Sequence, residues 1–403
     1  DFSFMVRTML GPHATEIAES MAKHGEHLSQ GQIATLLSIP ILAGALLRIV
    51  LGFFVDKIGP KKTAIAAQMI VIASLFYAYS RGANITYNEL LLVAFGLGFA
   101  GASFAVALPQ AGQWYPPKLQ GIVLGIAGAG NIGVVVDFLF APKIAEKWGW
   151  EAVFLVGGIL SVLVLIAYIF LAKDAPRSVY KPRPKKLADY WKLLKDRDSW
   201  WFMLFYAVSF GGFVGLANYM KVYLMNTYQA DMSTFGISAF HEPNVKVIAG
   251  YFGALTIFAG AVLRPIGGAI ADKMGGIKAL YIFFGIVAIL VILMGAVHLP
   301  FFAAIVVLFL IMASLGMANG AVFQLVPQRF GKDIGIMTGL IGAAGGIGGT
   351  FLIKTLGWAK GNFDSYSIGF FVFAGLVLLA IAAISLVKTR WRTTWGANAG
   401  GMI

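Results

Sequence analysis

Long apolar runs are the feature that most constrains the fold of this chain. A helix needs roughly 20 apolar residues to cross a bilayer core that is about 30 Å thick. Only 12% of the residues are charged, whereas a soluble domain is nearer a quarter. Runs of the required length lie near 31–55, 63–80, 88–114, 119–142, 151–172, 200–225, 246–272, 278–298, 300–328, 334–357 and 366–388.

The opening stretch, residues 2–17, is apolar but shorter than the other runs. We expect it to be the outer part of a first helix whose beginning precedes this sequence. Counted with the longer runs, it predicts an all-α integral membrane protein of about twelve transmembrane helices. None of the runs has the basic head and small-residue cleavage site of a signal peptide.

The net charge of +13 is a topology signal rather than a sign of nucleic-acid binding. Basic residues concentrate in loops after even-numbered helices, and an excess of Lys and Arg marks cytoplasmic loops. We therefore expect both termini in the cytoplasm and no nucleic-acid partner. The basic residues in question are Lys57, Lys61, Lys62, Lys273, Lys278, Arg329, Lys332, Lys388, Arg390 and Arg392.

The absence of cysteine removes disulfides, thiol catalysis and thiolate metal sites. No metalloprotease helix, P-loop or serine elbow is found, so we expect no enzyme, no cofactor and no metal. A receptor would ordinarily carry a soluble signalling domain, and none is present. A channel remains an alternative that flux kinetics would test. We expect a monomer in the lipid bilayer.

Residues 174–199 form the one clear linker, which is basic and contains Pro176, Pro182 and Pro184. Its amphipathic part, 187–194, is expected to lie on the membrane surface. The linker divides the chain into a six-helix half at 1–173 and a second at 200–403.

The two halves repeat one sequence frame, R-x3-G-x3-D-K-x-G. It starts at Arg48 in the first half and at Arg264 in the second. A second pair supports the repeat: Gly101-Ala-Ser-Phe104 in one half and Gly320-Ala-Val-Phe323 in the other, each followed by Pro-Gln. Repeated halves are typical of transporters whose substrate site lies between them at the bilayer midplane.

The loop G-x3-D-K-x-G-x-K-K after Gly52 resembles the signature loop of the major facilitator superfamily. The Gly-rich runs 98–104, 121–133 and 335–349 resemble the paired signatures of its nitrate/nitrite porter family. This resemblance covers the whole chain. It implies a multi-pass protein of the cell membrane that moves nitrate and nitrite by alternating access.

Arg48 and Arg264 each lie eight residues before an Asp at the cytoplasmic end, which is about 12 Å along a helix. Both are therefore expected near the midplane, where a charge is costly and usually faces a water-filled path or a partner. The acid found well inside a run is Asp137, and one acid cannot neutralise two arginines. Forked guanidinium donors suit a planar oxyanion, although phosphate or a carboxylate would fit the charge as well.

Aromatic walls for a planar anion are expected around these arginines. Tyr206 and Phe210 lie one turn apart on one helix face. The family resemblance also places Phe104 and Asn131 in the site. The alternative for these residues is a role in packing between helices or against lipid. The G-x-G-x-x-G pattern at 96–101 and 128–133 could indicate a dinucleotide site, but such a site needs a βαβ unit, which is not predicted here.

Gly52, Asp56, Gly268 and Asp272 are expected to form a conformational gate at the cytoplasmic face, with solvated loop charges as the alternative. Two uncompensated arginines would make the empty site costly to reorient, which favours exchange of nitrate for nitrite. Proton-coupled symport is the alternative, and the candidates for the titrating residue are Asp137, Glu16, His13 and Lys354. The role of Arg7 in the first helix stays open.

Overall fold

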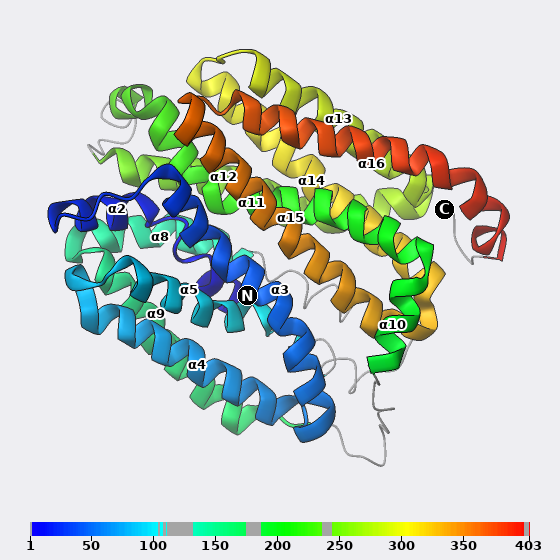
Figure 1. The fold of residues 1–403 in the computed structure, drawn as a ribbon, viewed down its shortest axis with the longest axis horizontal. Helices are drawn as coiled ribbons and strands as arrows, with labels where there is room; N and C mark the ends of the chain where they lie inside the picture. The colour runs from blue at the N-terminus through cyan, green and yellow to red at the C-terminus, as the bar shows by residue number, and fades with distance from the viewer. Residues whose placement is uncertain are drawn as a thin grey trace. The chain divides into compact units, whose positions relative to one another are not determined.

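A computed structural model of the chain describes residues 2–103, 105–107, 110, 132–174, 187–235, 244–398 and 403. For Asp56, Leu187 and Lys332 it describes the backbone alone. Every regular element within these ranges is a helix (Figure 1). The chain divides into two compact units, which we call the N-terminal unit (Asp1–Leu187) and the C-terminal unit (Ala188–Ile403).

The described helices of the N-terminal unit follow the predicted apolar runs, and long helices dominate it. They are α1 (Phe2–Thr8), α2 (Ala14–Lys23), α3 (Gln30–Ile58), α4 (Pro60–Arg81), η1 (Gly82–Asn84), α5 (Tyr87–Ala102), α8 (Ile132–Trp148) and α9 (Trp150–Leu171), with α10 (Leu187–Lys195) at the boundary of the two units.

The C-terminal unit is built from longer helices. They are α11 (Arg197–Phe235), α12 (Val245–Met274), α13 (Gly276–Ala296), α14 (Phe301–Phe330), η4 (Gly331–Asp333), α15 (Ile334–Phe363), α16 (Ser367–Thr393) and η5 (Trp395–Asn398). The α11 helix bends at Tyr228, whose backbone is not helical.

In the described part of the chain, 10 helices are long and apolar enough to cross a membrane. The other two predicted segments contain α1 with α2, and α8. The predicted helix over 2–17 was wrong in one respect, because Met9–His13 is a turn between α1 and α2. Pro12 explains the break, since proline lacks the N–H that a continuous helix would need and clashes with the preceding turn.

Helices pair in the same order in both units. In the N-terminal unit α3 packs along α5, α4 along α9, and α1 along α8. In the C-terminal unit α12 packs along α14, α13 along α16, and α11 along α15 (Figure 1). Each pair joins helices at equivalent places in the repeat, so the repeated sequence builds a repeated pattern of packing.

The glycine that ends each repeated frame also ends a helix. Gly59 closes α3 with φ 88° and ψ 159°, and Gly275 closes α12 with φ 93° and ψ 136°. Residues with a side chain rarely adopt these backbone angles, so glycine is required at both turns. The turn then leads directly into the next helix, α4 or α13.

Candidate anion-binding site

Arg48 and Arg264 occupy matching places in their helices. Arg48 lies ten residues before the end of α3, and Arg264 lies ten residues before the end of α12. Ten residues of helix span about 15 Å, which is half of a bilayer core. Arg48 is 8% exposed, and Arg264 is half-buried. Charges at such a depth are costly unless they face a polar path or a ligand.

A cluster of three aromatic rings lies beside the Arg264 guanidinium within the C-terminal unit, and two of them contact it. Tyr206 and Phe210 of α11 stack with centroids 4.9 Å apart and planes 5° apart. Phe323 of α14 meets Tyr206 edge-on at 5.2 Å. The Arg264 Cζ lies 5.3 Å from the Phe323 ring centre, which is the range of a cation–π contact.

The one hydrogen bond of the Arg264 side chain within the described residues is long. Its Nη2 donates to the Tyr206 hydroxyl at 3.5 Å, the outer limit for such a bond. Arg264 forms no ion pair with any carboxylate in the part of the chain that the structure describes. The guanidinium therefore keeps most of its donor capacity for a ligand beside flat aromatic faces.

Glycines allow the helices that carry these rings to approach closely. A Cβ placed at Gly345 of α15 would lie 2.8 Å from ring atoms of both Tyr206 and Phe210. A Cβ at Gly320 of α14 would overlap the backbone carbonyl oxygen of Arg264 itself. Gly345, from the Gly-rich run 335–349, and Gly320 thus provide packing surfaces beside the aromatic cluster.

Phe323 is the residue of this cluster that the sequence analysis missed. The repeat contained the signal, because Phe323 stands in the second half where Phe104 stands in the first, and Phe104 was named. Phe104 and Asn131 lie outside the described residues. Tyr206, Phe210 and Arg264 are brought together, whereas Arg48 lies in the other unit. The binding role of all these residues stays a prediction.

The expected gate residues are only partly described. Gly52 and Gly268 are half-buried in α3 and α12, and Asp272 is exposed near the end of α12. A Cβ at Gly268 would lie 3.8 Å from the Gly320 carbonyl oxygen, so this helix crossing is close here too. The side chain of Asp56 lies outside what the structure describes.

Arg7 and Asp137 are both buried inside the N-terminal unit, each 3% exposed. Arg7 lies in α1, which packs against both α5 and α8, and Asp137 lies in α8. The aliphatic part of Arg7 packs on α5, where a Cβ at Gly101 would lie 2.5 Å from the Arg7 Cδ. Its Cζ lies 4.6 Å from the Phe4 ring centre.

A second charged cluster, which the sequence analysis missed, lies at the start of α11. Asp198 is 5% exposed and accepts hydrogen bonds from Arg329 Nε at 2.8 Å, from Trp391 Nε1 at 2.8 Å, and from Arg390. Arg329 also pairs with Asp196 at 2.6 Å. These contacts tie the start of α11 to the ends of α14 and α16.

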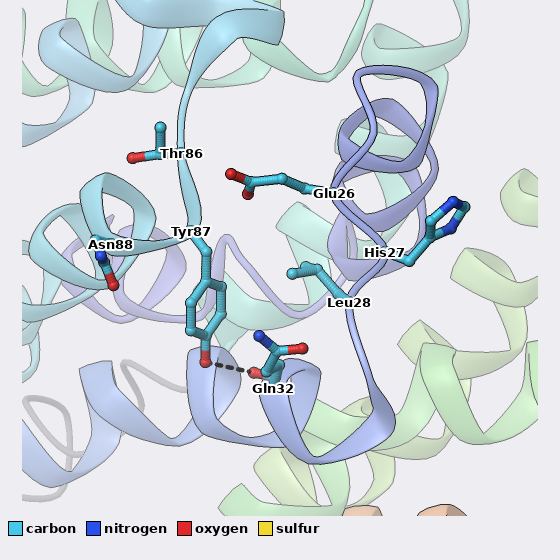
Figure 2. Close-up of a pocket in the computed structure, with 7 residues that line it drawn as sticks. All are labelled: Glu26, His27, Leu28, Gln32, Thr86, Tyr87 and Asn88. Carbon is cyan, nitrogen blue, oxygen red and sulfur yellow. Dashed lines mark hydrogen bonds between the residues drawn. The ribbon is translucent and has the colours of Figure 1, made fainter.

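A cavity of about 290 Å³ lies in the N-terminal unit, at the turn before α3 and the start of α5. Figure 2 shows Tyr87 reaching the Gln32 backbone carbonyl, to which its hydroxyl donates at 3.1 Å, while the His27 ring points away. Arg48 lies 16 residues beyond Gln32, about 24 Å along α3. This cavity is therefore separate from the buried arginine. Its lining residues are Glu26, His27, Leu28, Gln32, Thr86, Tyr87 and Asn88.

The helix pairing and the buried arginines define a two-unit membrane transporter. Residues 2–353 match the Major Facilitator Superfamily, and the chain belongs to this superfamily. Two solved structures share the fold: a bacterial homologue of the human lysosomal transporter Spinster (TM-score 0.71, 18% identity, 96% of this chain and 94% of that one) and the nucleoside transporter NupG (TM-score 0.70, 15% identity, 96% and 97%).

Within the superfamily, the chain belongs to a family of nitrate and nitrite transporters. It is 30% identical over 400 residues to the probable nitrate/nitrite transporter NarK2 of Mycobacterium tuberculosis. The alignment covers 95% of this chain and 93% of that relative. It is 29% identical to the nitrite extrusion protein of Bacillus subtilis (91% and 86%) and 29% identical to the probable nitrate/nitrite antiporter NarK1 of Thermus thermophilus (89% and 83%).

Proposed function

We propose that this protein carries nitrate and nitrite across the cell membrane by alternating access. The observation that carries the proposal is the Arg264 guanidinium, which faces Phe323 and Tyr206 and has no carboxylate partner among the described residues. A planar anion with delocalised charge gains from forked donors and from flat apolar faces at once. The names of the relatives identify nitrate and nitrite as that anion.

The proposed site takes one arginine from each unit. Arg48 and Arg264 supply positive charge at equal depths in their helices, and Tyr206, Phe210 and Phe323 form an aromatic wall. Phe104 and Asn131 are further proposed binding residues. Asp56 and Asp272, with Gly52 and Gly268, form the gate at the ends of α3 and α12.

The proposed mode is exchange of one anion for the other. An arginine charge within the membrane is costly, so reorientation of the carrier without a bound anion is slow. A bound anion offsets part of that charge and lowers the barrier. Nitrate then enters as nitrite leaves, and a relative described as a nitrate/nitrite antiporter is consistent with this mode.

The first test is nitrite-loaded proteoliposome exchange against external nitrate. Arg48→Lys and Arg264→Lys keep the charge but remove the forked donors, and we expect each to reduce exchange by at least about tenfold, as for the loss of one charge-assisted hydrogen bond. Arg392→Lys is the matched control, because Arg392 is exposed at the end of α16. Normal exchange in both site variants would reject the arginine site.

Proton-coupled symport is the second candidate, favoured by Asp137, which is buried in α8. A carboxylate that binds and releases a proton during transport would make uptake depend on pH. Asp137→Asn should then abolish the pH dependence while nitrate binding persists. If uptake by the variant keeps the pH dependence of the wild type, symport through this residue is excluded.

For topology, we propose halves at 1–173 and 200–403 joined by a cytoplasmic linker at 174–199, with both termini in the cytoplasm. The excess of basic residues in the linker and at the end of α16 supports this orientation. We further propose that the transporter acts as a monomer. Labelling of single cysteines added to this cysteine-free chain would test the orientation directly.

A further inference from the structure

The α10 helix exposes one cationic face. Ala188, Trp191, Lys192 and Lys195 are all exposed, and their spacing of three and four residues places them on one side of the helix. Leu193, on the other side, is buried in the C-terminal unit. The helix is therefore held by its apolar side and presents its basic side outward.

Two exposed tryptophans flank this face. Trp191 of α10 is 59% exposed, and Trp200 near the start of α11 is 57% exposed. The Trp200 indole is oriented by its Nε1–H, which donates to the Leu194 carbonyl of α10 at 2.9 Å. The exposed Arg197 is the first residue of α11. We call Trp191, Lys192, Lys195, Arg197 and Trp200 the Trp–Lys surface.

The acids of this segment do not neutralise the Trp–Lys surface. Asp196 and Asp198 accept hydrogen bonds from Arg329, and Asp198 also from Arg390, all on the inner side of the segment. Asp189 is half-buried on α10. The chain thus turns two carboxylates inward and leaves Lys192, Lys195 and Arg197 exposed, so the outer surface is strongly cationic.

We infer that the Trp–Lys surface binds the headgroups of anionic phospholipids in the adjoining leaflet. Tryptophan rings prefer the headgroup level of a bilayer, and clustered Lys and Arg attract anionic headgroups. Both kinds of side chain occur here together, on α10 and in the first turn of α11. The inference rests on the proposed insertion of the chain in a bilayer, but not on its substrate.

The test measures lipid binding with the full chain in detergent and without nitrate. Phosphatidylglycerol should raise the thermal unfolding temperature by a few degrees more than phosphatidylcholine with the same acyl chains, because a ligand stabilises the state that binds it. The variant K192Q/K195Q/R197Q should lose most of this difference. The control variant K273Q/K278Q/R392Q removes three exposed charges elsewhere in the C-terminal unit and should keep it.

Equal loss in both variants, or full retention in the test variant, would overturn the inference. So would an equal shift produced by inorganic phosphate. If the test variant is itself less stable in phosphatidylcholine, Trp191→Phe with Trp200→Phe provides a second measurement. Brominated phosphatidylglycerol should quench more fluorescence in the wild type than in this variant. A normal lipid result with failed nitrate exchange would reject only the proposed function.

Discussion

The two units pair their helices in the same order, yet they close the repeated crossing differently. In the C-terminal unit, Gly320 of α14 lies directly against the backbone of Arg264 in α12. In the N-terminal unit, the equivalent Gly101 of α5 meets the flexible side chain of Arg7 first, and the Gly44 backbone lies farther away. At this pair of equivalent glycines, an added Cβ would therefore first meet backbone in one unit and a side chain in the other.

The units also differ in how a carboxylate ties their helix ends together. Asp174, just after α9, accepts a hydrogen bond from the backbone N–H of Lys61 in the first turn of α4, at 3.1 Å, and lies exposed. Asp198 is buried and accepts hydrogen bonds from three side chains. Equivalent helix pairing therefore does not imply equal hydrogen bonding at the helix ends, which are tied by more side-chain hydrogen bonds in the C-terminal unit.

The largest effect should come from removing these carboxylates. Asp198→Ala removes the acceptor of three hydrogen bonds to a charged group, one of them from the buried Trp391 indole, and should cost about 3 kcal/mol or more. Asp174→Ala removes a cap at the start of α4, which costs about 1 kcal/mol. The unfolding free energy of each variant in detergent measures the difference. Similar losses at both positions would show that the two units are tied equally.

The next effect concerns the two helix crossings. Gly320→Ala places a Cβ on the Arg264 carbonyl, and overpacking of this kind costs about 1–3 kcal/mol. Gly101→Ala should cost less than about 1 kcal/mol, because the Arg7 side chain can change rotamer whereas a backbone cannot. Thermal unfolding of the two variants tests this ranking. A larger loss for Gly101→Ala would mean that Arg7 is as fixed as the backbone.

The aromatic residues Phe323 and Phe104 occupy matching positions in the two halves, and we predict that each forms a wall of the anion site. Phe323→Leu removes the ring beside Arg264, and the loss of about 1–2 kcal/mol of cation–π and ring contact would weaken nitrate binding by about five- to thirtyfold. The repeat predicts a similar loss for Phe104→Leu. Calorimetric titration of nitrate into both variants measures it. Weakened binding in one variant alone would assign the wall to a single unit.

The helices could be predicted from the sequence because apolar runs of about twenty residues leave few alternatives in a membrane. The break at Pro12 was missed because the short opening run was interpreted as one helix. Arg264, Tyr206 and Phe210 were identified by depth and spacing. Phe323 was missed although the repeat aligned it with Phe104, so the repeat was informative but was not applied to the aromatic wall.

The Asp198 cluster could not be predicted in the same way. Its partners Arg329 and Arg390 lie 131 and 192 residues away in the chain. Each one, viewed alone, is an ordinary charge at a helix end, where basic residues also mark the cytoplasmic side. Only the packing of α14 and α16 beside the start of α11 joins these separate charges into one network around the buried Asp198.

The smallest effect should come from the Tyr206 hydroxyl, and it separates the roles of ring and hydroxyl in the C-terminal unit. The hydroxyl lies 3.5 Å from Arg264 Nη2, too far for a strong hydrogen bond. Tyr206→Phe keeps the stack on Phe210 and should weaken nitrate binding by about twofold or less, within 0.5 kcal/mol on the usual scale for a hydrogen bond. Tyr206→Leu, which removes the stack, should weaken it by about threefold to tenfold. Titration of nitrate into both variants distinguishes them. A loss of tenfold or more in Tyr206→Phe would mean that the hydroxyl binds the anion directly, so that the C-terminal unit would provide a hydrogen-bond donor beyond its arginine.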